Sequence, residues 1–169
     1  MDDQEFWALV EAARVASNDN VDDRPGALEQ LLMRRQPDEV QDFQDLYDKM
    51  RRRANRWSLW GAAWLMNGGC SDDGFRYFRD WLISEGRRVF EASLADPDSL
   101  ADLPRLDGFE LEDFGYVASD VYQQITGNDL EPALFDDSAD PEGEQWNEDE
   151  LPSMFPRLAE KYGEAQYDD

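Results

Sequence analysis

The fold of this chain is decided by residues 57–88, Trp57-Ser-Leu-Trp60-Gly-Ala-Ala-Trp64-Leu-Met-Asn67-Gly68-Gly69-Cys70-Ser71-Asp72-Asp73-Gly74-Phe75-Arg76-Tyr-Phe78-Arg79-Asp80-Trp81-Leu-Ile83-Ser-Glu85-Gly86-Arg87-Arg88. In the first part of this stretch, tryptophans recur at helical spacing while leucine, alanine and methionine form a second stripe. A helix that is apolar on all sides is typical of a buried helix. We therefore predict a buried helix over 57–67, ended by glycines that adopt left-handed backbone conformations easily.

The second part of the stretch predicts another helix that packs directly against the first. Ser71 stands where an N-cap residue belongs, and Asp72 and Asp73 follow it in the first turn, where acidic side chains favour the helix dipole. Phenylalanine, tyrosine and tryptophan then recur on adjoining faces. The centre of the protein is thus expected to be a pair of buried aromatic helices.

The same reasoning extends outward along the chain. Apolar residues at three-four spacing, with helix starts and stops, predict further helices over 3–16, 24–36, 37–56, 88–94, 108–127 and 151–162, the last broken by Pro156. Few β-branched residues occur, and there is no internal repeat. These features predict an all-α fold, a single globular helical domain of about seven to eight helices.

The domain prediction is one unit over residues 1–169, since a chain of this length suits one domain. Residues 1–127 are expected to form its core. Residues 128–150 are acidic, contain two prolines and lack periodicity, so they predict a long irregular connection near the C-terminus. Residues 151–162 are expected to form a C-terminal helix that packs back on the core.

Charge is distributed unevenly along the chain. The formal net charge is -24; residues 1–94 hold 18 acids against 13 bases, whereas residues 95–169 hold 22 acids against 3 bases. Such a field repels nucleic acids and anionic lipids and attracts basic protein surfaces. We therefore expect neither a nucleic acid nor a membrane partner. The acid can equally serve solubility, and both interpretations remain open.

Two absences exclude common catalytic sites. The chain has no histidine, which excludes hydrolases built on a nucleophile and histidine and zinc sites built on histidine. It has one cysteine, Cys70, too few for an internal disulfide or a cysteine-rich metal site. The acidic start, and the lack of a signal peptide and of an apolar run of about 18 residues, predict a cytoplasmic protein.

Several segments resemble a known family. They are Phe6-Trp-Ala-Leu-Val-Glu-Ala-Ala-Arg14, Leu59-Trp-Gly-Ala-Ala, the long motif Asn67-Gly-Gly-Cys-Ser-Asp-Asp-Gly-Phe-Arg-Tyr-Phe-Arg-Asp-Trp-Leu-Ile-Ser-Glu-Gly86, and Asp96-Pro-Asp-Ser-Leu-Ala. Together they resemble a bacterial family catalogued as domain of unknown function 4240, over about 5–127 and again over 152–162. The resemblance implies a stand-alone bacterial domain, and it implies no activity, cofactor or catalytic residue.

The corner between the two central helices is the first candidate site. Asp72 and Asp73, beside flexible glycine backbone, could hold a hard divalent cation such as Mg²⁺ through their carboxylate oxygens. The structural interpretation is that Ser71 caps the helix and both acids satisfy its dipole. If the structural interpretation holds, no cofactor is needed.

Arginines on or just after the second central helix form the other candidate site. Arg76, Arg79 and Arg87, with Glu85 as an acid or base, could bind a carboxylate or phosphate by two-point contacts. The structural interpretation pairs these arginines with the many acids of the chain. The tryptophans likewise allow either a stacking platform or an ordinary core.

Two functions follow from these features. The first is a cytoplasmic, acidic protein-interaction domain of the inhibitor, immunity or adaptor type, which binds a basic partner. The alternative is a metal-assisted enzyme that uses carboxylates and arginines on an anionic small molecule. No catalytic motif decides whether the protein is an enzyme. The oligomeric state and the identity of the partner or substrate stay open.

Overall fold

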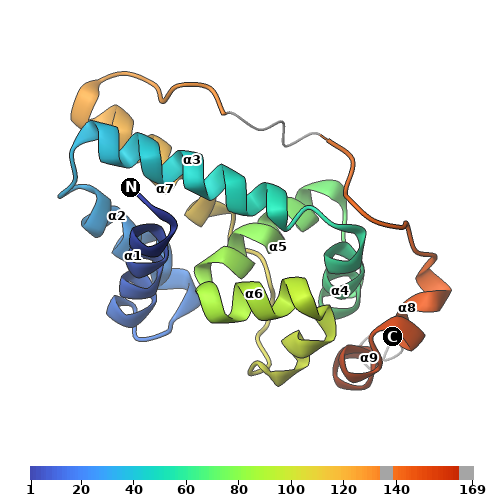
Figure 1. Ribbon diagram of the computed structural model, residues 1–169. Coiled ribbons are helices and arrows are strands. Elements are labelled where there is room, and N and C mark those ends of the chain that lie inside the picture. Colours follow the sequence, from blue (N-terminus) through green and yellow to red (C-terminus); the bar gives the residue numbers. More distant parts are fainter. Residues whose placement is uncertain (134–138, 164–169) are drawn as a thin grey trace.

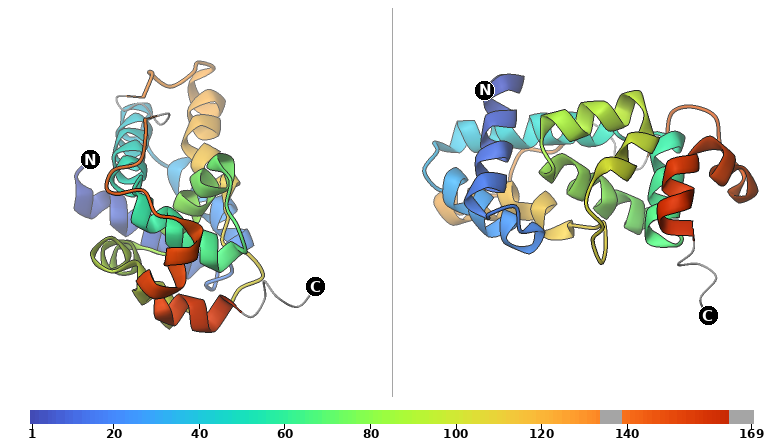
Figure 2. Two further views of the ribbon diagram at one scale, coloured as in Figure 1. Left: turned by 90° about the vertical axis from the view of Figure 1, so that its right-hand side faces the viewer. Right: turned by 90° about the horizontal axis from the view of Figure 1, so that it is seen from below.

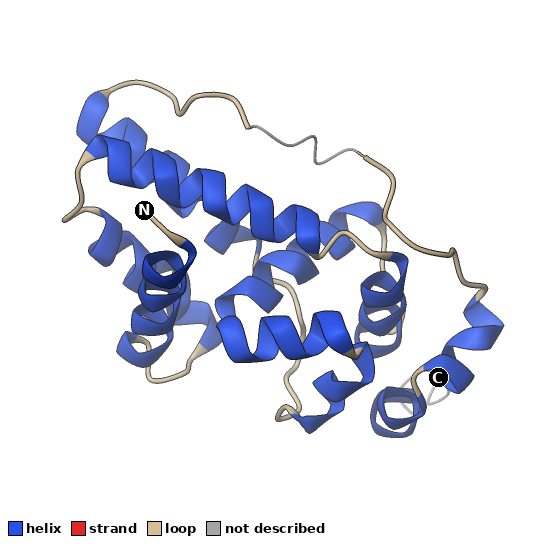
Figure 3. Cartoon of the chain, viewed as in Figure 1, coloured by secondary structure: helices blue, strands red, loops and turns tan. Residues whose placement is uncertain are grey.

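The computed structural model describes residues 1–133 and 139–163, and these residues form an all-α fold, as the sequence predicts (Figures 1 and 3). No β-strand occurs in the described residues. In chain order, with η for 3-10 helix, the elements are α1 (Asp3–Ala16), η1 (Val21–Asp23), α2 (Arg24–Leu32), α3 (Pro37–Arg53), α4 (Trp57–Asn67), α5 (Asp72–Ser84), α6 (Arg87–Ala95), η2 (Pro97–Asp102), α7 (Glu112–Thr126), η3 (Glu148–Glu150), α8 (Leu151–Met154) and α9 (Pro156–Tyr162).

Local sequence sets many of the helix ends. The Asp2 side chain accepts a hydrogen bond of 2.8 Å from the Glu5 amide, and the Glu5 side chain accepts one of 3.1 Å from the Asp2 amide. Such a reciprocal capping box satisfies two amides that the first helical turn leaves without partners. Pro37 opens α3, where a missing amide hydrogen costs nothing. Gly127, with φ 74°, ends α7 in the left-handed conformation.

The helices enclose one continuous apolar core. In Figure 1, α3 crosses the top of the molecule with α7 behind it, and α5 lies in the centre. Helix α5 packs against α7, α3, α1 and α6, while α2 joins α1 to α7. The largest fully buried side chains are mostly aromatic: Trp81, Tyr47, Phe6, Phe43, Phe75, Phe78, Phe90, Phe109 and Phe114. The central position of α5 explains why all its residues from 78 to 84 are buried.

The two central aromatic helices do touch, but only one of them is enclosed. The rings of Trp60 on α4 and Phe75 on α5 stack with centroids 5.1 Å apart. Helix α4, however, lies toward one end of the molecule, next to α8 and α9, and Trp57, Trp60 and Trp64 are half-buried (Figures 1 and 2). The prediction that α4 is buried on all sides is therefore wrong for its tryptophan stripe.

Helix α7 starts later than the predicted position 108. The preceding residues are not helical, because α5 and α4 supply other partners for their backbone. The Leu111 amide donates to the Tyr77 carbonyl at 3.0 Å, and the Phe109 amide donates to Asn67 Oδ1 at 3.2 Å. Both side chains, Phe109 and Leu111, are buried. The apolar spacing from Phe114 onward does lie on α7, whereas Leu111 stands just before the helix.

Residues 139–162, called the C-terminal segment, contact α4 and η2 through α8 and α9. Trp146 donates its indole N–H to the Trp57 carbonyl at 2.6 Å. Gly61 makes room for this crossing: a Cβ there would lie 2.7 Å from Leu151 and 3.1 Å from Phe155. Of the predicted irregular connection, the described residues 128–133 and 139–147 contain no α-helix, and residues 134–138 lie outside the described residues.

None of the described helices combines the length and the apolar character needed to cross a membrane.

Candidate functional site

The residues between α4 and α5, from Gly68 to Ser71, end one helix and start the next. Gly68 has φ 68° and Gly69 has φ 114°, both in the left-handed region that favours glycine. Ser71 Oγ accepts a hydrogen bond of 3.1 Å from the Gly74 amide, the contact expected of an N-cap. The geometry therefore matches the structural interpretation of this corner, in which every residue type has a local role.

Asp72 and Asp73 lie exposed in the first turn of α5. Within the described ranges, no three or more acidic, histidine or cysteine residues converge as a metal site requires. The neighbouring thiol of Cys70 is buried, and burial, with a contribution from Glu110 and Asp72, raises its pKa to about 12. A thiol with this pKa is protonated near neutral pH, so Cys70 is a poor nucleophile.

The two candidate arginines of α5 have different surroundings. Arg79 is buried; its guanidinium donates to the Arg51 carbonyl at 3.2 Å and lies 4.8 Å from the centre of the Phe75 ring. Arg76 is half-buried and lines a cavity of about 270 Å³ between α3 and α7. Arg79 thus belongs to the core, whereas Arg76 faces a space that a ligand could enter.

Glu85 and Arg87 lie at the other end of α5. A helix rises 1.5 Å per residue, so Asp72 and Glu85 are separated by roughly 20 Å along the axis. Glu85 and Arg87 line a second cavity, of about 470 Å³, next to α1 and the start of α6. One small ligand cannot contact Asp72 and Glu85 together, so the candidate residues do not converge on a single site.

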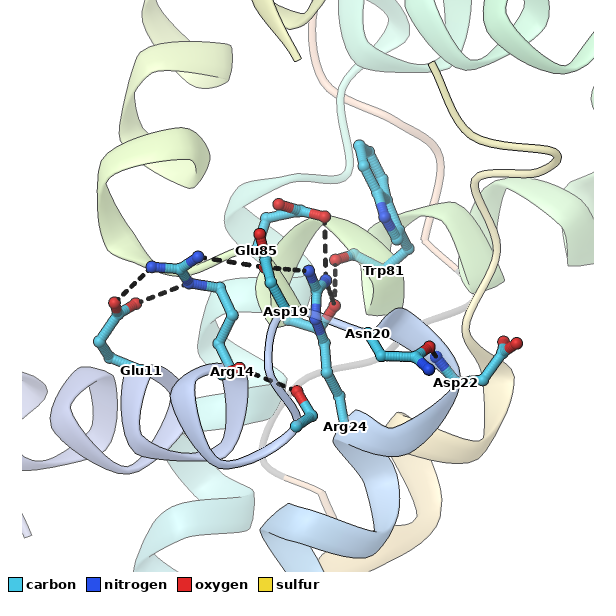
Figure 4. A network of polar contacts seen from close by, with 10 residues as sticks. Glu11, Arg14, Asp19, Asn20, Asp22, Arg24, Trp81 and Glu85 are labelled. Carbon is cyan, nitrogen blue, oxygen red and sulfur yellow. Dashed lines mark hydrogen bonds and ion pairs between the residues drawn. The ribbon is translucent and has the colours of Figure 1, made fainter. Parts of the chain in front are cut away.

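A network of ion pairs stands beside this second cavity (Figure 4). Its centre is Arg24, 2% exposed, which donates to Glu85 Oε1 at 2.9 Å, to Ser84 Oγ at 3.0 Å and to Asp19 Oδ1 at 2.9 Å. Arg14 donates to the same Asp19 oxygen at 3.1 Å and forms two hydrogen bonds to Glu11. The network connects α1, the start of α2 and the end of α5.

The loop that supplies Asp19 adopts an unusual backbone. Asn18 and Asp19 have φ of 52° and 62°, the described non-glycine residues with positive φ. Burial opposes ionisation of Asp19, but the hydrogen bonds from Arg14 and Arg24 outweigh it and lower the pKa of this carboxyl. The Arg14 guanidinium likewise lowers the pKa of Glu11. The ion pairs of Asp19 with Arg14 and Arg24 hold this loop against α1 and the start of α2.

A buried cluster forms the floor of the cavity between α3 and α7. Arg51, 5% exposed, donates to Asp80 Oδ1 through Nε at 3.2 Å and through a terminal nitrogen at 2.7 Å. Tyr47 donates its hydroxyl to the same oxygen at 2.6 Å. Burial raises the pKa of Asp80, while Arg51 and Tyr47 act in the opposite direction. The backbone of α7 approaches this cluster closely at Gly115, where an added Cβ would lie 2.6 Å from Arg51.

Sequence reasoning assigned no site to this cluster. Tyr47 and Arg51 are four residues apart and therefore share one face of α3. That spacing is the local signal of the cluster; the approach of Asp80 and Gly115 depends on how α5 and α7 pack.

The chain belongs to the family described as protein of unknown function (DUF4240), whose model matches residues 1–124. The comparisons with curated proteins and with solved structures found no match. The family match covers α1 to α6 and most of α7, including the corner, both cavities' helical walls and the buried cluster. The C-terminal segment that crosses α4 follows the matched residues.

Proposed function

We propose that this member of the family is a cytoplasmic interaction module that offers an acidic surface to a basic protein partner, as an inhibitor, immunity protein or adaptor does. The observation that carries the proposal is where the acid lies. Sixteen acidic side chains are exposed in the described part of residues 95–163, against two exposed basic ones, Arg105 and Arg157. We call these the C-terminal acids: Asp96, Asp102, Asp107, Glu110, Glu112, Asp113, Asp120, Asp129, Glu131, Asp140, Glu142, Glu144, Glu148, Asp149, Glu150 and Glu160.

The first half of the chain uses its acids differently. Its arginines and its N-terminus hold many acids in ion pairs, such as Arg53 with Glu91 at 2.8 Å and the N-terminal amine with Asp42 at 2.7 Å. In contrast, the ion pair found among the C-terminal acids in the described residues joins Asp102 to Arg157. Most of the C-terminal acids are therefore not neutralised by an ion pair within the described residues, and their charge can attract an external cation.

The expected partner presents a lysine- and arginine-rich face. Exposed charges attract a basic protein over a Debye length, about 8 Å at physiological ionic strength, and accelerate its association. Single exposed pairs add little affinity, so a surface of this kind requires many contacts together. The same field repels phosphate backbones, and a nucleic acid is for that reason not the proposed partner.

The alternative, a metal-assisted enzyme, needs Asp72, Asp73, Arg76, Arg79 and Glu85 around one ligand. Helix α5 separates its two ends by roughly 20 Å. Glu85 pairs with the buried Arg24, and Arg79 donates into the core. The interaction function does not require these five side chains to surround one ligand, and we therefore prefer it to the enzyme.

The test uses affinity capture from cytosol of the source organism, with matched charge variants. One variant carries Asp120→Asn, Glu144→Gln, Glu148→Gln and Asp149→Asn; the control carries Asp22→Asn, Asp23→Asn, Glu29→Gln and Asp38→Asn. Both remove four negative charges, from different halves of the chain. We expect one basic protein to bind the wild type and the control, to bind the first variant far more weakly, and to dissociate as the salt concentration rises.

Two results would contradict the proposal. One is that no protein is retained even at an ionic strength of about 0.01 M, where charge attraction reaches about 30 Å. The other is that both four-charge variants lose the partner equally, because net charge rather than the C-terminal acids would then be responsible. Direct titration of the purified partner with each variant distinguishes specific binding from general attraction.

A further inference from the structure

We propose that the basic protein partner docks where the start of α5 meets the start of α7, with one of its lysine or arginine side chains over the ring of Tyr116. This contact rests on the proposed function, since Glu112 and Asp113 of this surface are two of the C-terminal acids. We call the surface the tyrosine face, and it comprises Asp72, Asp73, Tyr77, Glu112, Asp113 and Tyr116.

The packing of α7 on α5 brings the members of the tyrosine face together. The Leu111 amide donates to the Tyr77 carbonyl at 3.0 Å, which holds the residue before α7 against α5. Glu112, through a hydrogen bond, raises the pKa of Tyr77, and Asp73 adds to this effect. Desolvation and the same Glu112 raise the pKa of Tyr116. Side chains from two helices therefore share one surface and act on each other electrostatically.

Tyr116 is a large aromatic side chain at the surface. The exposed large hydrophobic side chains of the described residues are Val15, Met33, Tyr116 and Met154, and Tyr116, 42% exposed, is the aromatic one. Its hydroxyl donates to Glu112 Oε1 at 3.2 Å, one turn earlier on the same face of α7. A cation over such a ring is attracted by the ring and by the carboxylate beside it. Tyrosine is also enriched among the residues that contribute most to protein–protein binding.

The acids of the tyrosine face are not neutralised by their helices. Each first turn carries two of them, Asp72 and Asp73 in α5 and Glu112 and Asp113 in α7. A helix N-terminus carries about half a positive charge, so the two helix ends offset about one of the four negative charges. In the part of the chain that the structure describes, no ion pair holds any of these four carboxylates. A basic side chain from outside therefore meets negative charge there.

One cation of the chain lies near the tyrosine face without reversing its sign. Arg76 acts to lower the pKa of Tyr116. It lines the cavity between α3 and α7, and the arginines of that cavity are matched by Asp48, Glu131 and the underlying Asp80. The charges of the cavity therefore balance one another, and the four acids of the tyrosine face remain uncompensated.

The test is an NMR titration of the ¹⁵N-labelled full-length chain with capped tetralysine, at an ionic strength of about 0.01 M, where charge attraction is little screened. We expect saturable binding, with larger amide shifts in residues 72–77 and 110–117 than in residues 140–150. Tyr116→Leu should weaken binding about threefold, the effect of losing one exposed cation–π contact. Tyr116→Phe keeps the ring and should bind within about twofold of the wild type.

A matched pair of charge variants separates this surface from net charge. Glu112→Gln and Glu29→Gln each remove one glutamate charge from a helix, the first in the tyrosine face and the second in α2. We expect Glu112→Gln to weaken tetralysine binding about threefold and Glu29→Gln to change it by less than about twofold. The amide spectrum of each variant reports whether its fold is intact.

Three outcomes would overturn the proposal. Equal affinity of the wild type and Tyr116→Leu, or an equal loss in both glutamate variants, would leave the proposed function standing with its contact elsewhere on the acidic surface. Tighter binding of spermine, which carries the same four positive charges, would show that the surface selects a small polyamine and not a protein. If tetralysine does not bind at all, the tyrosine face and the proposed function are both wrong.

Discussion

Two glycines in helices show how much one missing methyl group matters. Gly26 in α2 faces open space, with nothing within 4 Å of an added Cβ. Gly115 in α7 lies directly against the buried ion pair, where the same Cβ would come within 2.6 Å of Arg51 and 2.9 Å of Asp80. Both positions have ordinary helical backbone, so the two differ in their neighbours and not in local conformation.

The first prediction compares Gly26→Ala with Gly115→Ala in urea unfolding. Alanine at an open helical site stabilises by about 0.5 to 1 kcal/mol, because the unfolded chain loses freedom. At Gly115 the added methyl collides with two immobilised charged groups, and overpacking costs about 1 to 3 kcal/mol. We therefore expect Gly26→Ala to raise the free energy of unfolding and Gly115→Ala to lower it. An increase in both variants would show that Arg51 and Asp80 are loosely held.

At the scale of elements, the C-terminal segment is the part that is added to the family core. Its first described residues pair with the start of α4: the Trp57 amide donates to the Glu142 carbonyl at 3.0 Å, and the Glu142 amide donates to the Asn55 carbonyl at 2.9 Å. Its last helix, α9, is fixed by Asp98 of η2. That carboxylate accepts from the Arg157 amide at 3.2 Å and from the Leu158 amide at 2.9 Å.

The second prediction is that Asp98→Ala releases α9 from the core. The change removes the acceptor of two amides at the helix start, and the loss of such a cap costs about 1 to 2 kcal/mol. Hydrogen exchange should accelerate at residues 156–162 more than in α5. The control is Asp102→Ala, four residues away, which breaks the exposed pair with Arg157 and should cost no more than about 0.5 kcal/mol. Equal protection of α9 in all three proteins would mean that apolar contacts alone hold it.

Several elements follow from local sequence, and two do not. The helices α1 and α3 start at the predicted residues, and Ser71 caps α5 as predicted, because these signals act within a few residues. The start of α7 was predicted too early, because the backbone of Phe109 and Leu111 is hydrogen-bonded to distant residues and not to a helical turn. The burial of α4 was also predicted wrongly for a long-range reason. The residues that cover one face of α4 lie more than 80 positions away in the sequence, so local spacing could not show which face they cover.

At the scale of the whole molecule, charge opposes compaction. A net charge of -24 is held within one domain, and like charges repel more strongly when the chain is folded than when it is extended. The ion pairs of the first half, such as Arg24 with Glu85, act in the opposite direction. The buried pairs are little affected by salt, whereas repulsion among exposed acids is screened.

The third prediction is that sodium chloride stabilises the protein. Raising the ionic strength from about 0.01 M to about 0.15 M shortens the Debye length from about 30 Å to about 8 Å, so repulsion should weaken more than the buried pairs do. A gain of about 1 kcal/mol corresponds to a rise of about 2 to 4 °C in Tm for a chain of this size.

Choline chloride at the same ionic strength is the control, because it screens charge without a small cation. An equal rise in Tm with both salts indicates screening. A fall in Tm with either salt would show that exposed ion pairs, and not net repulsion, dominate the electrostatic energy. A rise with sodium chloride alone would indicate a sodium site in place of screening.

The candidate sites differ in how far apart in the sequence their interacting residues lie. The capping role of Ser71, Asp72 and Asp73 is readable in seven consecutive residues, since each contact joins near neighbours. The grouping of Arg76 with Arg51 and Arg52, and the pairing of Glu85 with Arg24, join residues 24 to 61 positions apart. No spacing rule within one helix reports such contacts.

The sequence by itself determined the helical class, the family, the charge asymmetry and several helix starts, because hydrophobic periodicity, capping and net charge are properties of neighbouring residues or of composition. Only the tertiary structure decided which arginines meet at one cavity, which carboxylate lies beneath them, and which face of α4 the C-terminal segment covers. Those outcomes depend on how helices pack against each other, and packing is chosen by the shape of the whole core.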